Sequence, residues 1–168
     1  SSCDVRRMRD PACRMYVRSN RLWTLRCSTW RRASLSAEIP GHAFARSIAT
    51  EMHSGFRPLR DKLGMELLKT LPGGAPYSPE VTADIKRIES IWREARTVWG
   101  EADSGPYLFG HFTVADGMYA PIVTRFRTYG VHLDSTCHNY MNTVLTDPDF
   151  RAWEAQAEKD PPQEPLPA

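Results

Sequence analysis

The stretch SPEVTADIKRIESIWREARTVWG, residues 78–100, constrains the fold more than any other part of this sequence. Ser78 is a good helix N-cap, Pro79 suits the first helical position, and Gly100 follows the end of the pattern. The apolar residues between them recur at helical spacing: Val81, Ile85, Ile88, Trp92, Ala95 and Trp99. Because these residues fall on one face, the sequence predicts a helix that packs lengthwise on a hydrophobic core.

The chain from Ala43 to Leu59 shows a second helical pattern, with apolar residues at steps of three and four. Pro58 lies near its end. Proline removes a backbone donor and clashes with the preceding turn, so we expect a kink there. The next segment, 64–77, ends in Pro and Gly residues, which predicts a connection with room for a short helical turn.

The sequence GHFTVADGMYAP, residues 110–121, marks the start of a third helix. Thr113 followed by Asp116 is a capping-box pattern, in which each side chain satisfies an orphan backbone N–H. A helix is therefore expected over residues 113–127. Two further helices are expected, over 134–145 and from 147 onward. No strand pattern appears after residue 40, so the predicted fold is all-α. We expect an antiparallel bundle of about five helices with Thr113–Phe126 buried at its centre.

Composition limits the class of protein. The chain has 168 residues, of which 41% are hydrophobic and 25% charged, and this fits one domain with a real core. It has no run of about 18 apolar residues and no apolar secretory segment, so we expect neither membrane insertion nor export, and a cytoplasmic location. The cysteines lack a Cys-x-x-Cys spacing, and Cys137, His138 and His132 lack the spacing of a metal site. We expect reduced thiols and no bound metal.

The first 32 residues are strongly basic. They hold nine Arg against Asp4 and Asp10, a charge of +7, whereas residues 33–168 sum to −5. Clustered Arg with aromatics can bind nucleic acid, and an Arg- and Ser-rich start resembles a transit peptide. No regular amphipathic pattern supports a transit peptide, and the Arg residues do not fall on one obvious face, so nucleic acid is not an expected partner. The predicted organisation has three parts: an atypical Arg-rich segment (1–40), poorly structured or an out-of-frame remnant, a helical domain (41–159) and a disordered tail (160–168).

Three segments occur in a recognisable order: FARSIATEMHSGFRPLR, SPEVTADIKRIESIW and GPYLFGHFTVADGMYAPIVTRFRTYGV. Together they make residues 43–158 resemble the C-terminal helical domain of bacterial glutathione S-transferases, especially zeta-like, maleylacetoacetate-isomerase-like members. The G-x-F-[ST]-x-A-D element is the buried capping box of that family. The resemblance implies that Thr113 and Asp116 support folding and are not catalytic. Gly117 departs from the pattern, because it offers no side chain to the hydrophobic staple.

The resemblance implies a transferase function, in which a glutathione thiolate attacks a small hydrophobic electrophile by conjugation or isomerisation. Complete members place a thioredoxin-like domain first, and that domain carries the thiolate-activating residue and the anchors for glutathione. Residues 1–40 show no β-α-β alternation, cis-proline signature or acidic-Ser pair, so we expect this half to be missing. The chain is then the substrate-side domain, with no catalytic residue and little glutathione binding or activity alone.

The resemblance also places side chains at the cleft between the two domains. The candidate cleft residues are Met52, His53, Phe56, Arg60, Tyr119 and Arg125. Each type has a structural alternative: helical spacing also makes Met52 and Phe56 core residues, a lone His near a kink is commonly a surface residue, and Tyr and Arg near helix ends are commonly structural.

A non-catalytic helical interaction or dimerisation module is the alternative function. The family dimer buries the start of the first helix against the partner's glutathione domain. Loss of that domain is therefore expected to weaken a homodimer and to expose apolar surface.

Overall fold

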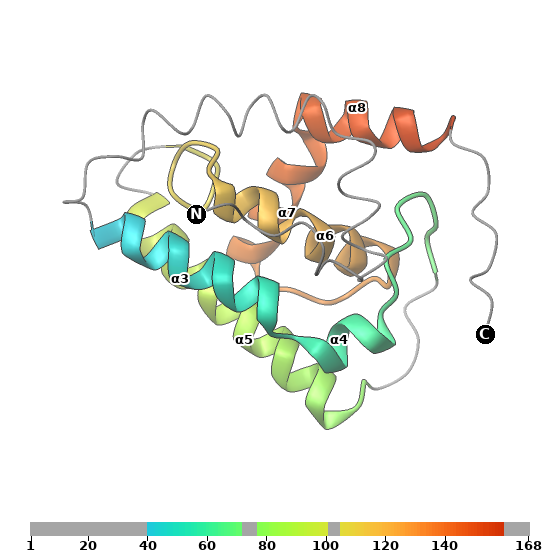
Figure 1. The fold of residues 1–168 in the computed structure, drawn as a ribbon, viewed down its shortest axis with the longest axis horizontal. Coiled ribbons are helices and arrows are strands. Elements are labelled where there is room, and N and C mark those ends of the chain that lie inside the picture. The colour runs from blue at the N-terminus through green and yellow to red at the C-terminus, as the bar shows by residue number, and fades with distance from the viewer. Residues whose placement is uncertain (1–39, 72–76, 101–104, 160–168) are drawn as a thin grey trace, which may run out of the picture.

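The computed structural model describes residues 40–71, 77–100 and 105–159. Their elements are, in order, α3 (Pro40–Ser54), α4 (Arg57–Lys62), α5 (Pro79–Ala95), the π-helical turn η2 (Arg96–Gly100), α6 (Val114–Thr128), α7 (Ser135–Thr146) and α8 (Pro148–Ala157). The described residues include no strand, so the predicted all-α class is confirmed (Figure 1). The predictions for the Arg-rich start and for the tail concern 1–39 and 160–168, which lie outside the described residues.

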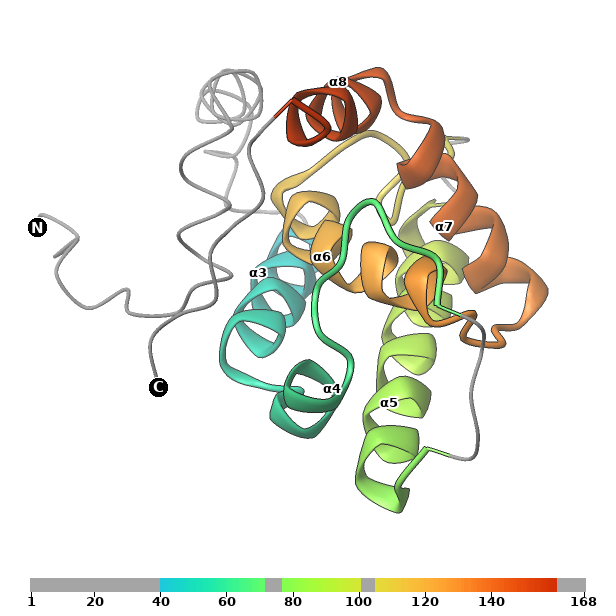
Figure 2. The ribbon, with the colours of Figure 1, turned by 90° about the vertical axis from the view of Figure 1, so that its right-hand side faces the viewer.

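Helix α6 runs through the middle of the bundle, between α3 and α7 (Figure 2). Its buried positions extend from Ala115 to Thr128 and lie on almost every side of the helix. A helix that is buried on all sides has to be covered by several neighbours. The expectation that the capped helix is the central one is therefore confirmed.

Trp92 of α5 is the packing centre of the core. Its side chain is fully buried, and its ring lies 5.7 Å from Tyr119, 5.6 Å from Phe126 and 4.9 Å from Tyr140, measured between ring centroids. The first two partners belong to α6 and the third to α7. Trp92 thus joins three helices through edge-on and tilted aromatic contacts.

The predicted kink at Pro58 is wrong in its position. The chain leaves the first helix earlier, at Gly55 and Phe56, and Phe56 takes a left-handed backbone conformation with φ 58°. Pro58 lies in the first turn of α4, where its missing N–H has no helical partner to lose. The proline therefore begins a new helix instead of bending the old one.

Local caps explain where the other helices begin. Ser78 accepts a hydrogen bond from the Val81 amide, as predicted for the start of α5. Asp134 and Asp147 accept from the first-turn amides of α7 and α8 in the same way. The predicted helix over 78–100 is α-helical only to Ala95 and ends in the π-helical turn.

The segment between α4 and α5 contains no helix in its described part, residues 63–71, and residues 72–76 lie outside the described residues. The short helical turn considered for 64–77 is therefore absent from 64–71. We call residues 63–71 the strap. It crosses the end of α6, where the Leu71 amide donates to the Thr128 carbonyl oxygen over 2.7 Å.

If Trp92 is the packing centre, Trp92→Phe should lower the free energy of unfolding by about 1–2 kcal/mol, since the smaller ring leaves a void among three helices. The matched variant Trp99→Phe, at a half-buried site, should cost clearly less. Urea unfolding followed by helical circular dichroism measures both, and equal losses would contradict this account.

Candidate functional site

The bend between α3 and α4 brings the first group of candidate residues together. α4 has six residues, and its backbone is tied to α5 because the Leu59 amide donates to Asp84 Oδ2 over 3.0 Å. Asp84 therefore supplies the cap that Phe56, the local N-cap residue, does not. The bend is held by a side chain from another helix.

Met52 and Phe56 point into the core at this bend. Both are buried, with exposed fractions of 6% and 7%, and both belong to the same apolar cluster as Trp92. The position of these two residues thus agrees with the alternative that they are core residues. Their contribution to a substrate cleft stays a prediction.

His53 and Arg60 are the accessible members of the candidate set. The His53 side chain is exposed and Arg60 is half-buried. Arg60 Nη1 donates to the His53 carbonyl oxygen over 3.2 Å and so bridges the last turn of α3 to α4. Of the candidate residues at the bend, these two carry the accessible polar groups.

Tyr119 lies on the core side of α6. Its side chain is fully buried, and its hydroxyl donates to the Ile48 carbonyl oxygen of α3 over 3.4 Å. Burial raises the pKa of Tyr119 well above its ordinary value, so the phenolate form is disfavoured. In this position Tyr119 joins two helices and is poorly suited to activating a thiol.

Arg125 is almost completely buried near the C-terminal end of α6. Its Nε donates to the Leu63 carbonyl oxygen over 2.8 Å, and its Nη1 donates to the Pro121 carbonyl oxygen over 3.0 Å. The first of these bonds fixes the point where α4 ends, because Leu63 is the C-cap residue of α4. Tyr119 and Arg125 thus connect α6 to the chain on either side of the bend, at Ile48 of α3 and at Leu63 after α4.

Thr113 and Asp116 meet at the start of α6. Asp116 Oδ2 accepts from the Thr113 amide over 2.7 Å and from the Thr113 hydroxyl over 2.9 Å, while its Oδ1 accepts from the Leu108 amide over 3.1 Å. Leu108 belongs to the loop before the helix. One carboxylate thereby fixes both the helix start and the loop that leads into it.

Burial and hydrogen bonding act in opposite directions on Asp116. Complete burial raises the pKa of Asp116, and the three bonds from Thr113 and Leu108 lower it, with burial the larger effect. The hydroxyl of Tyr140 is also buried, and its interaction with Asp116 is a further effect that lowers the pKa of Asp116. Burial likewise raises the pKa of the Tyr140 hydroxyl well above its ordinary value.

Some residues that position this region were not singled out from the sequence. Asp84 caps α4, and Arg127 donates to the Leu67 carbonyl oxygen and to Glu154. The sequence carries a weak signal for Asp84 alone, since it directly precedes the buried Ile85 on the most regular helix. Arg127 is one of two arginines in the last turn of α6, a pattern that does not identify its partners.

Residues 78–156 match the family model described as glutathione S-transferase, C-terminal domain. No match was found among curated proteins. The matched segment begins at the cap of α5 and ends in α8, and thus includes the central helix α6. It supports a relation of this helical body to the C-terminal domains of glutathione S-transferases, a class of helical substrate-binding domains.

The match divides the candidate residues into two groups. Thr113, Asp116, Tyr119 and Arg125 lie inside the matched segment, whereas α3, α4 and the bend between them lie before it.

Within the described residues no helix is long and apolar enough to span a membrane. Over the same residues no group of three His, Cys, Asp or Glu side chains is placed to hold a metal ion.

Asp116→Ala should lower the free energy of unfolding at neutral pH by about 2–4 kcal/mol, because it leaves buried backbone donors without an acceptor. The pKa of Asp116 is raised in the folded state, so wild type gains stability as pH falls from above that raised pKa toward the ordinary value. The alanine variant lacks this gain. The stability gap between the two proteins should therefore widen on acidification.

Asp61→Ala is the matched control, because Asp61 is an exposed acidic residue whose ion pair with Arg57 is also exposed. It should change stability by less than about 0.5 kcal/mol. Chemical denaturation of the three proteins over a series of pH values measures the gap. A gap that narrows as pH falls would show that hydrogen bonding, not burial, dominates at Asp116.

Proposed function

We propose that this chain provides the substrate-side helical domain of a glutathione S-transferase-like protein, of the zeta-like, maleylacetoacetate-isomerase-like kind. The match over residues 78–156 is the observation that carries the proposal. The function is to bind a small hydrophobic electrophile beside glutathione, for conjugation or isomerisation. The proposed location is the cytoplasm, where glutathione is the abundant thiol.

The chemistry of Tyr119 and Cys137 is consistent with the proposed binding role. Activation of the glutathione thiol needs a group that stabilises the thiolate. Tyr119 is buried with a raised pKa and its hydroxyl donates to a backbone oxygen. Burial also raises the pKa of the Cys137 thiol to about 12, which makes this cysteine unreactive. We therefore propose that the chain alone has little or no transferase activity.

The bend between α3 and α4 is the proposed border of the substrate site. It carries the accessible side chains of His53 and Arg60, close in sequence to the buried apolar side chains of Met52 and Phe56. An apolar floor with a few polar groups at its edge is the usual composition of a small-molecule site. Glutathione would meet Arg60 there through its carboxylates, but two polar side chains make a weak anchor.

An interaction or dimerisation module is the alternative function. Three large apolar side chains are exposed on the described surface: Leu68, Leu71 and Val98. Exposed apolar side chains favour protein contacts when they adjoin one another. Under this alternative the chain self-associates and does not bind glutathione derivatives.

The test is isothermal titration of the purified chain with glutathione and with S-hexylglutathione, followed by an aryl chloride conjugation assay. The proposal predicts weak or no heat with glutathione, measurable binding of the S-hexyl compound because of its apolar tail, and no turnover above the uncatalysed rate. Glutathione-dependent turnover would contradict the assignment of a substrate-side domain.

Arg60→Ala tests the place of the site. Loss of a charged hydrogen-bond donor should weaken S-hexylglutathione binding by about tenfold. Arg57→Ala is the matched control, since Arg57 lies on the same short helix but is exposed. Equal affinities of the two variants for S-hexylglutathione would contradict a binding site at the bend. A stable dimer that binds neither thiol compound would favour the interaction module, and sedimentation of the same sample detects it.

A further inference from the structure

The strap, residues 63–71, is fastened to α6 by side chains that reach its backbone. Its carbonyl oxygens accept from three residues near the C-terminal end of α6: Arg125 to Leu63, Thr128 to Glu66, and Arg127 to Leu67. A segment without helix or strand has no partners of its own for these oxygens. The α6 side chains therefore replace the hydrogen bonds of regular structure.

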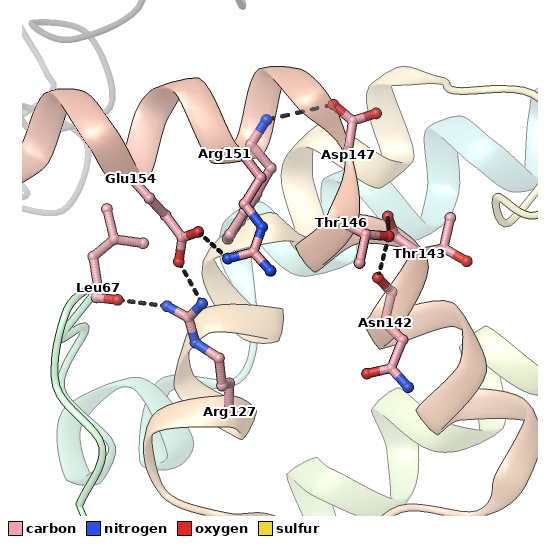
Figure 3. A network of polar contacts seen from close by, with 9 residues as sticks. Leu67, Arg127, Asn142, Thr143, Thr146, Asp147, Arg151 and Glu154 are labelled. Atoms are coloured by element: carbon pink, nitrogen blue, oxygen red, sulfur yellow. Dashed lines mark hydrogen bonds and ion pairs between the residues drawn. The ribbon is translucent and has the colours of Figure 1, made fainter.

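Arg127 is different from the other two because its guanidinium also reaches α8 (Figure 3). One terminal nitrogen donates to the Leu67 carbonyl oxygen of the strap, and the other donates to Glu154 Oε1 of α8. The guanidinium carbon also lies 6.0 Å from the ring centre of Phe150. A single planar group thus has partners on two elements that are distant in sequence.

The Arg127–Glu154 pair is well shielded from water. The exposed fractions of the two side chains are 27% and 12%, far below those of the Arg57–Asp61 pair, at 88% and 65%. Glu154 Oε2 accepts from Arg151 Nη1 over 3.0 Å, but the Arg151 side chain is 58% exposed. Breaking a shielded pair leaves a charge without its partner, so its loss costs more than the loss of a surface pair.

We propose that Arg127 is a latch that couples α8 to the strap. With Glu154 in place, the guanidinium is held in the plane that also serves the Leu67 carbonyl oxygen. Without Glu154 the guanidinium loses one of the contacts that orient it, and its hydrogen bond to the Leu67 carbonyl oxygen weakens. The strap begins at the C-cap residue of α4. A change in the position of Glu154 in α8 is therefore expected to alter the mobility of the strap and of the short helix α4, which carries Arg60. This coupling does not depend on the proposed substrate site.

Hydrogen exchange of the folded chain tests the latch. Glu154→Gln removes the charge in α8, and the proposal predicts about fivefold faster exchange at the Leu71 amide, which donates to Thr128. Arg127→Met keeps an apolar stem and should speed exchange in both the strap and α8. Arg151→Met is the matched control: it removes the other Glu154 partner but no contact with the strap, so Leu71 should exchange at the wild-type rate.

The Ile88 amide of the buried helix α5 monitors global stability. Faster exchange at Leu71 with unchanged exchange at Ile88 supports the latch. An unchanged Leu71 rate in Glu154→Gln would overturn the proposal, and so would an equal increase at Ile88, because global destabilisation then accounts for the effect. An Arg151→Met variant that speeds Leu71 as much as Arg127→Met would overturn it as well.

Discussion

The carboxylate of Asp116 fixes the helix on which the rest of the structure depends. It accepts hydrogen bonds from Thr113 and from Leu108, and it thereby sets where α6 begins and how the preceding loop enters it. α3 and α7 pack on α6, and Trp92 of α5 reaches its aromatic side chains. A shift at this start would displace every surface that its neighbours bury. Burial of a carboxylate is costly, and the hydrogen bonds from buried donors offset part of that cost.

Arginine side chains perform a related task at the irregular segments. Arg96 donates to the carbonyl oxygens of Gly105 and Tyr107, in the loop that leads to α6. Arg125 and Arg127 donate to the strap. In each case a guanidinium on a helix satisfies carbonyl oxygens that have no helix of their own, because its several donors point in fixed directions. The helical body therefore positions its connections through polar side chains as well as through apolar packing.

Local patterns in the sequence predicted the helices and their caps well. The Ser78 cap, the period of the apolar residues after it and the helix starts near residues 134 and 147 depend on neighbouring residues only, so they can be read directly. The break at Phe56 could not be predicted in this way. It depends on the burial of Phe56, which holds this residue in an unfavourable left-handed backbone conformation, and on Asp84, which lies 25 residues from the amide that it binds.

The candidate site shows the same division. The sequence resemblance placed Met52, Phe56, Tyr119 and Arg125 at one cleft. In the structure they lie on α3, just before α4 and on α6, and all four are buried. Burial depends on the packing of whole helices, so a cleft position and a core position have the same spacing in the sequence. The tertiary partners of Arg127, on the strap and on α8, could not be predicted from the sequence for the same reason.

Native-state hydrogen exchange at the Thr113 and Leu108 amides tests the central claim most directly, because both amides donate to Asp116. If Asp116 anchors the start of α6, these amides should exchange only when the whole domain unfolds, with the same opening free energy as the Ile122 amide in the middle of the helix. Exchange at Thr113 and Leu108 that is much faster than at Ile122 would show that the start of α6 opens by itself, and would contradict the account.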